Sequence, residues 1–350
     1  MAVKQVPGRV AGIRPGVPGT APASVAAGRI TVPARTRLAT LPTPLVAAPR
    51  LAEALGTGPL YIKRDDLTGF AFGGNKARQL EFLLAAAIAD GADTLVTGGA
   101  ADSNFCAAAA AAALRAGLRC ELVIAGEPRP SGPALALALS WGATVHWTGA
   151  RERESIDACL PLAAADLTAR GHRPYLVPRG GATGLGAAGY ALAAFELHGQ
   201  LAERGVGAAL VLVPVGSGGT MAGLVAGHVL LGRPWTLIGG SASRPPEVAG
   251  GRVLALAREC LAVLAAAGLP DIGPADVVVT DARGPGHGLP SPAATKVAEQ
   301  AMRTEGLIVD PVYNAKALAL AQPPAGGQTV VFWHTGGVLD AVAAAGEAHR

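Results

Sequence analysis

One lysine stands where an amine is unusual for a helix. Lys76 directly follows Gly73, Gly74 and Asn75, and an alanine-rich helical pattern over residues 77–91 begins right after it. The N-terminus of a helix carries partial positive charge, so acidic residues are favoured there and lysine is not. An amine held against this charge loses its proton more easily, and a neutral amine is a nucleophile. The alternative is a solvated lysine without a chemical role.

A glycine-rich loop offers a place for an anion. Gly216, Ser217, Gly218, Gly219 and Thr220 lie between the apolar run "VLVPV" and a helical pattern. A loop that leads from a strand into a helix presents unpaired backbone N–H groups to an anion, and the threonine adds a hydroxyl donor. The loop is not a Walker A motif, and the next strand ends without the acid that binds a ribose. These features fit a small phosphate group, and a tight turn without a ligand is the alternative.

Polar residues also follow other apolar runs. Ser103 and Asn104 come after "VTGG" at the start of a helical pattern, where they either cap the helix or face a ligand. Tyr313 follows Asp-Pro-Val after an apolar stretch that we expect to be a strand, and Thr335 follows the strand-like "VVFWH". Open α/β sheets place their sites at the carboxyl ends of strands. A lysine and a phosphate loop without nucleotide-binding features predict pyridoxal phosphate, an aldehyde cofactor that Lys76 holds as a Schiff base.

The elements that must position these residues alternate along the chain. Strands are predicted over residues 59–66, 93–99, 119–126, 144–149, 173–178, 208–215 and 236–243, and helices over 77–91, 104–117, 132–142, 156–171, 185–205 and 220–232. Val/Leu/Ile runs that are bounded by glycine and followed by helices indicate parallel strands covered on both faces. The predicted fold class is therefore α/β, with mostly parallel strands and helices on both faces.

Glycine and proline indicate how the chain is divided. The stretch "GGATGLG" at residues 180–186 predicts a hinge. It separates a small domain, residues 77–178, from a large cofactor-binding domain made of residues 35–76 and 179–350. Residues 1–34 are rich in Pro, Gly and Ala and predict a flexible N-terminal arm.

Composition argues against several classes of protein. The formal net charge is +4, from 29 basic and 25 acidic residues in a chain of 350, and no long basic run occurs, so we expect no nucleic-acid partner. No apolar stretch is convincing as a membrane span. Cys106, Cys120, Cys159 and Cys260 lack CxxC spacing and paired histidines. We therefore expect no disulfide framework and no metal site, and a reducing cytoplasm as the location.

The sequence resembles the D-cysteine desulfhydrase and aminocyclopropane-carboxylate deaminase family of pyridoxal-phosphate enzymes. The resemblance runs from about Thr36 to Ala345, and its most specific part is "YIKRDDLTGFAFGGNKARQLEFLL", with "PYLVPRGGATGLGAAGY" and "EGLIVDPVYNAKA" as further matching stretches. It implies the tryptophan-synthase-β-like fold, PLP fold type II, with two open, mostly parallel, twisted sheets. It also implies a small amino acid as substrate and a homodimer.

The same resemblance implies a role for each motif residue. Lys76 carries the cofactor, the loop Gly216–Thr220 binds its phosphate, and Ser103 lies near the substrate carboxylate. The cofactor ring is implied to meet three further side chains, with Asn104 near the ring hydroxyl, Thr335 at the pyridine nitrogen and Tyr313 beside the ring.

Two positions distinguish the branches of this family. The cyclopropane-opening deaminases typically have Glu after the tyrosine and Leu in an H-L-G-G motif, whereas this chain has Asn314 and Thr335. A carboxylate holds a proton on the pyridine nitrogen and makes the ring a strong electron sink, and a neutral hydroxyl does so much less. Ring opening needs the stronger sink, whereas β-elimination discharges the carbanion at once through a leaving group. We therefore expect β-elimination from D-cysteine or another β-substituted alanine, giving pyruvate and ammonia.

Several alternatives stay open. They are an aminocyclopropane-carboxylate deaminase that releases 2-oxobutyrate, a racemase, dehydratase or β-replacement enzyme with the same cofactor, and a non-catalytic ligand-binding protein. The chain departs from the family pattern at Asp102, Phe105, Cys106 and Ala107 around the Ser-Asn pair, at Pro133, and at His287, which stands where the family has a tyrosine. These departures allow a substrate other than D-cysteine. His287 is expected to be an active-site acid or base, with a surface histidine as the alternative.

Overall fold

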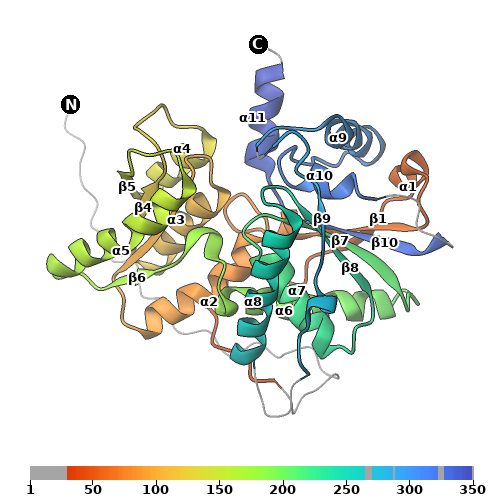
Figure 1. Ribbon diagram of the computed structural model, residues 1–350, viewed down its shortest axis with the longest axis horizontal. Helices are drawn as coiled ribbons and strands as arrows, with labels where there is room; N and C mark the ends of the chain where they lie inside the picture. The colour runs from red at the N-terminus through yellow and green to blue at the C-terminus, as the bar shows by residue number, and fades with distance from the viewer. Residues whose placement is uncertain (1–29, 265–269, 287, 322–326, 349–350) are drawn as a thin grey trace, which may run out of the picture.

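The computed structural model describes residues 30–264, 270–286, 288–321 and 327–348, which form two sheets (Figure 1). The small sheet contains β3 (Thr94–Gly99), β4 (Arg119–Ile124), β5 (Thr144–Trp147) and β6 (Pro174–Leu176), in the order β5-β4-β3-β6. The large sheet contains β1 (Leu45–Ala47), β2 (Leu60–Arg64), β7 (Ala209–Val215), β8 (Thr236–Ser241), β9 (Val278–Asp281) and β10 (Thr329–His334), in the order β1-β2-β10-β7-β8-β9. The pairings are parallel except that of β1 with β2.

Helices cover both faces of each sheet. On the small sheet, α2 (Lys76–Ala89), α3 (Asn104–Ala116) and α4 (Pro133–Ser140) share one core, and α5 (Arg153–Ala169) packs on the other face. On the large sheet, α6 (Gly184–Ala202), α7 (Gly219–Leu230) and α8 (Pro246–Val263) cover one face, and α1 (Pro49–Leu55), α9 (Pro292–Glu305) and α10 (Asn314–Leu318) cover the other. Three short 3-10 turns and a last helix complete the described chain: η1 (Asp65–Leu67), η2 (Arg179–Gly181), η3 (Pro274–Asp276) and α11 (Val338–Ala348).

The central strands confirm the predicted burial on both faces. In β10, Val331 and Trp333 pack against α6–α8, while Val330 and Phe332 pack against the opposite helices. Because side chains alternate along a strand, a continuous apolar run is the pattern expected for a sheet between two helical layers. The predicted fold class, α/β with two mostly parallel sheets, is confirmed.

The apolar stretch before Tyr313 is not a strand, contrary to expectation. Residues 306–310 belong to no helix or strand, and Leu307 and Val309 are buried in the core on the α9 side of the large sheet. β10 already has β2 on one side and β7 on the other, so no sheet edge is available next to it. The segment therefore packs over the sheet, where the carbonyl of Ile308 accepts a hydrogen bond from the ring of His334 at 2.7 Å.

Most of the predicted N-terminal arm lies outside the described residues. Of its last part, the backbone N–H of Thr31 donates to the carbonyl of Leu264 at 2.9 Å, and Val32 packs against the core of the large sheet. The strands of the small sheet all lie between residues 94 and 176. The domain boundaries at 76/77 and 178/179 stay a prediction.

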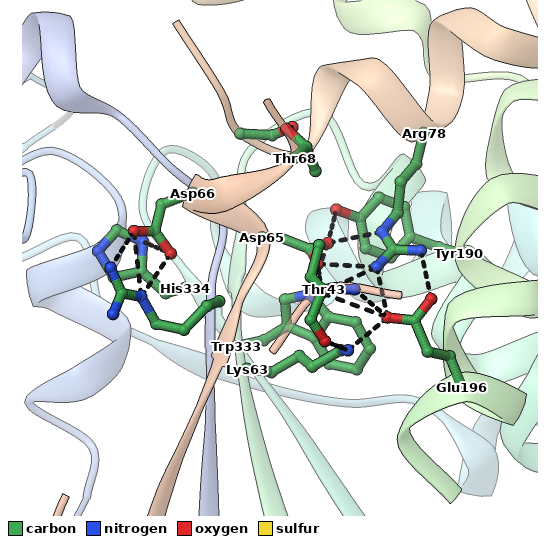
Figure 2. A network of polar contacts seen from close by, with 12 residues as sticks. Thr43, Lys63, Asp65, Asp66, Thr68, Arg78, Tyr190, Glu196, Trp333 and His334 are labelled. Carbon is green, nitrogen blue, oxygen red and sulfur yellow. Dashed lines mark hydrogen bonds and ion pairs between the residues drawn. The ribbon is translucent and has the colours of Figure 1, made fainter. Parts of the chain in front are cut away.

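A buried network of charges fixes helix α2, whose first residue is Lys76 (Figure 2). Arg78 Nε and Nη2 each donate to Asp65 at 2.9 Å, and Nη2 also donates to Glu196 Oε1 at 2.9 Å. Lys63 forms an ion pair with Glu196. Burial alone would raise the pKa of Asp65, but the Arg78 guanidinium outweighs it and lowers that pKa to about 2. Buried charges are tolerated when they are paired in this way. The pairs connect α2 to η1 and to α6, and α6 to β2.

Candidate active site

A cavity of about 490 Å³ lies between the two sheets, at the carboxyl ends of their strands. The predicted site residues that line it are Lys76, Ser103, Asn104, Gly216, Ser217, Gly218, Thr220, Tyr313 and Thr335. Gly219 is buried as the first residue of α7 and is not among the lining residues. His287 lies outside the described residues, and its neighbour Gly288 lines the cavity.

Lys76 is half-buried, and few neighbouring groups stabilise the positive charge of its amine. Burial lowers its pKa to about 8, and within the described part of the chain its side chain has no hydrogen-bond or ion-pair partner. Desolvation disfavours the charged form, so an appreciable fraction of the amine is neutral near neutral pH. Burial is thus a cause of the lowered pKa that the sequence did not indicate, and the effect of the partial charge of the helix stays a prediction.

Asn75 connects the lysine to the glycine loop. Its Nδ2 donates to Thr220 Oγ1 at 2.9 Å, and its backbone N–H donates to the carbonyl of Thr335 at 2.9 Å. Gly74 has a φ of 96°, and a Cβ there would lie 2.9 Å from the same carbonyl. Only glycine tolerates both the backbone angle and the close approach. The turn before Lys76 is therefore held against the start of α7 and the end of β10.

Two arginines that also line the cavity hold the backbone of the glycine loop. Arg244 Nη1 donates to the carbonyl of Gly216 at 2.7 Å, and Arg252 Nε donates to the carbonyl of Ser217 at 2.8 Å. Gly218 has a φ of 98° and is the cap of α7. Because these two carbonyls point towards the guanidinium groups, the backbone N–H groups at the start of α7 are available to bind an anion.

Four side chains keep buried polar atoms without a partner among the described residues, and two of them, Gln79 and Asn104, belong to the helices that begin at Lys76 and beside Ser103. The unpartnered atoms of these two are both amide atoms of Gln79 and Oδ1 of Asn104. A Cβ at Gly219 would lie 2.8 Å from Gln79 Nε2, so this amide lies against the start of α7, although Gln79 is not among the residues that line the cavity, whereas Asn104 is. An unsatisfied buried polar group costs about 1–3 kcal/mol and is expected where a ligand supplies the partner. The site therefore fits a polar, phosphorylated cofactor. Gln79 was missed from the sequence, although it lies one helical turn after Lys76.

The start of α3 faces the cavity as well. Ser103 Oγ accepts a hydrogen bond from the backbone N–H of Cys106 at 3.3 Å, so Ser103 both caps the helix and lines the cavity. Asn104 Nδ2 donates to Asp340 Oδ2 at 2.7 Å. Burial, and then the charge of Asp310, raise the pKa of Asp340 to about 7. Asp340 was not recognised from the sequence.

A neutral pair stands at the end of β10. Asn314 Oδ1 accepts from the backbone N–H of Thr335 at 2.9 Å and from its hydroxyl at 3.1 Å. Asp310 accepts from the side chain of Asn314 and from the backbone N–H of Tyr313 at 2.7 Å. The ring of Tyr313 lies beside Gly216, where an added Cβ would be 3.0 Å from its Cε1. Asp310, also missed from the sequence, thus orients the turn that carries Tyr313 and Asn314.

Comparisons with known proteins agree with this geometry. Residues 36–336 match the family described as pyridoxal-phosphate dependent enzyme. The D-cysteine desulfhydrase of Salmonella choleraesuis (strain SC-B67) is 38% identical over 316 residues, which cover 87% of this chain and 94% of that protein.

Solved structures give the same result. An ACC deaminase homologue superposes with a TM-score of 0.79 and 31% identity, covering 88% of this chain and 93% of that one. A fungal L-serine ammonia-lyase from Rhizomucor miehei, at a TM-score of 0.63 and 16% identity over 90% and 99% of the two chains, shares the fold. The family resemblance and the cofactor predicted from the sequence are confirmed: this chain belongs to the family of pyridoxal-phosphate-dependent enzymes.

Proposed function

We propose that this protein is a lyase that catalyses β-elimination from a small β-substituted amino acid and yields pyruvate and ammonia. The observation that carries the proposal is the neutral pair of Thr335 and Asn314. A neutral hydroxyl gives the cofactor ring weaker electron-withdrawing power than a carboxylate would. This suits a reaction in which a leaving group removes the negative charge, and it disfavours cyclopropane ring opening.

The residues that would hold the cofactor come from both sheets. Lys76 would bind its aldehyde, and Gly216–Thr220 with Gln79 would bind its phosphate. Asn104 and Thr335 would face its ring. When bound, pyridoxal phosphate supplies an electron-withdrawing ring that stabilises negative charge at the substrate Cα.

Proton transfer falls to the chain's own groups. Lys76 leaves the aldehyde when the substrate amine replaces it there. Its free amine, with a pKa of about 8, can then accept the proton from the substrate Cα near neutral pH. Ser103, at the cap of α3, would donate a hydrogen bond to the substrate carboxylate, and Tyr313 would shape the pocket beside Gly216. We keep His287 as a candidate acid or base at the site, next to the cavity-lining Gly288.

A panel of amino acids tests the reaction. The purified protein with pyridoxal phosphate is given D- and L-cysteine, D- and L-β-chloroalanine and aminocyclopropane carboxylate, and pyruvate and 2-oxobutyrate are separated by chromatography. We expect pyruvate from at least one β-substituted alanine and no product from Lys76→Ala. Release of 2-oxobutyrate from aminocyclopropane carboxylate, without pyruvate from the others, would support the deaminase instead.

We further propose a cytoplasmic homodimer. The four cysteines are free, as expected in a reducing compartment, and no helix within the described ranges is long and apolar enough to cross a membrane. Light scattering coupled to size-exclusion chromatography tests the dimer, since a monomer has a mass of 34.8 kDa.

A further inference from the structure

The cavity carries far more positive charge than the glycine loop alone would explain. Its lining includes Arg129, Arg151, Arg153, Arg179, Arg244 and Arg252. Acidic side chains line it too, but Asp310 and Asp340 are engaged with Asn314 and Asn104, and Asp102 is exposed. The six arginines and Lys76 outnumber the three aspartates of the lining, and a cavity with such an excess of one sign of charge attracts ligands of the opposite sign.

Three of these arginines have a structural role already. Arg244 and Arg252 hold the carbonyls of the glycine loop. Arg179 forms a two-pronged ion pair with Asp157, at 2.7 and 2.5 Å. Arg244 and Arg252 also lie beside the loop that would bind the phosphate of the cofactor, so that phosphate accounts for their charge.

Arg153 has no such partner. It is the first residue of α5, and Ile156, one turn later on the same face, packs against Gly98 at the end of β3 and lines the cavity. Arg153 is half-buried, and among the described residues it has no hydrogen bond or ion pair. Its charge nevertheless acts across the cavity: burial lowers the pKa of Arg244, and Arg252 and Arg153 lower it further. A half-buried guanidinium that has no acidic partner and whose charge repels a second guanidinium is stabilised by binding an anion.

The neighbouring arginines extend this charge towards solvent. Arg129 follows β4 and Arg151 follows β5, and both are exposed and line the cavity. All three therefore lie in the segments that follow β4 and β5 at the carboxyl ends of the small sheet, and they line the same cavity as the glycine loop of the large sheet. We call Arg129, Arg151 and Arg153 the arginine rim.

We propose that the substrate carries a second acidic group on Cβ, a sulfonate or a phosphate ester, and that the arginine rim binds it, with Arg153 as the main contact. This inference rests on the proposed β-elimination. Lys76 takes the proton from Cα, and the bond from Cβ to the acidic group breaks with both electrons leaving on that group, as sulfite or as phosphate. Water then converts the remaining three-carbon amine to pyruvate and ammonium. Arginine beside the leaving group stabilises the charge that develops there.

The test compares acidic and neutral substrates on the loaded enzyme. D- and L-cysteic acid supply the sulfonate, D- and L-phosphoserine the phosphate ester, and D- and L-cysteine and β-chloroalanine serve as neutral substrates. Pyruvate, sulfite and phosphate are measured. We expect kcat/KM to be at least tenfold higher for one of the acidic substrates than for any neutral one.

Arg153→Gln shows whether the rim acts on the substrate. We expect it to lower kcat/KM for the acidic substrate by about 10- to 100-fold, the loss typical of a hydrogen bond to a charged group, and to change the neutral substrates less than threefold. The Kd for pyridoxal phosphate is measured in parallel and is expected to stay within twofold of the wild type. Arg170→Gln, which removes an exposed arginine paired with Asp166 on the same helix, is the matched control and is expected to change nothing.

The outcomes separate the two proposals. Pyruvate from neutral substrates only, or an equal loss on acidic and neutral substrates in Arg153→Gln, overturns the arginine rim and leaves the lyase intact. A weaker Kd for pyridoxal phosphate in Arg153→Gln, without a substrate-dependent loss, assigns the residue to the cofactor instead. No pyruvate from any substrate overturns the proposed function itself.

Discussion

Lys76 is expected to react with aldehydes near neutral pH far faster than an ordinary lysine. Its pKa is lowered by burial to about 8, from an ordinary value of 10.5. At pH 7 about 10% of such an amine is neutral, against about 0.03% for an ordinary lysine, so the reactive fraction rises by about 300-fold. Since only the neutral amine attacks an aldehyde, the rate of cofactor uptake follows this fraction.

Stopped-flow absorbance measures the effect. The protein is stripped of cofactor, mixed with pyridoxal phosphate at pH values from 6 to 10, and followed through the absorbance change on binding. The second-order rate constant is expected to rise about tenfold per pH unit below pH 8 and to level off above it. A small amine, such as 6-aminohexanoate, measured at the same pH values corrects for the ionisations of the cofactor.

The rate at high pH decides whether burial lowers the pKa of Lys76. A corrected rate that continues to rise tenfold per unit beyond pH 9.5 shows an amine of ordinary pKa, and the reasoning from burial is then wrong. Lys76→Ala is expected to abolish the covalent step while it leaves weaker, non-covalent binding.

Three further changes have expected results. Gly223→Ala in α7 places a Cβ 2.1 Å from the carbonyl of Ala187, so urea unfolding should show a loss of about 3 kcal/mol, whereas Gly199→Ala, with nothing within 4 Å, should be neutral or slightly stabilising. Asp65 has a pKa of about 2 in the folded chain against 3.8 for the free residue. Its ionised form therefore adds about 2 kcal/mol to the free energy of unfolding above pH 4, and this contribution is lost as the pH falls towards 2. A titration midpoint near pH 4 for the Asp65 carboxyl, measured by ¹³C NMR, would contradict the pairing of Asp65 with Arg78. Gln79→Leu removes two buried polar atoms that have no partner in the protein, so it should not lower the stability of the cofactor-free protein. It should weaken pyridoxal-phosphate binding about tenfold, because the cofactor loses a hydrogen-bond partner, and calorimetry measures both effects.

Much of the fold could be predicted because parallel α/β sheets have a strong local pattern. The strands and helices from β2 to β8 lie where apolar runs and glycines indicated them, within a few residues at each end. Helices α1, α8, α9 and α10 and strands β1 and β9 were not predicted. The amphipathic α9 and the short, half-exposed β9 have weaker apolar runs, and only the completed sheet stabilises them.

The site was predictable where one motif contains the chemistry, as with Lys76 and the glycine loop. It was not predictable where the partner is distant in sequence. Asp340 meets Asn104 across 236 positions, and Arg153 begins a helix that shows no motif. Such side chains can be recognised only in the folded structure, where the strands bring the segments that carry them to the cavity at the carboxyl ends of the sheets.

The position of β10 bears on how the protein is made. It lies between β2 and β7, yet it is the last strand of the chain. On the ribosome, β2 and β7 therefore emerge with a gap between them, and the middle of the large sheet stays open until residues 329–334 have left the exit tunnel. Thr335 and Asp340 follow later still. We therefore expect the nascent chain to take up its cofactor only after residues 329–340 have left the exit tunnel, and chains that stop short of β10 to expose two unpaired edges prone to aggregation.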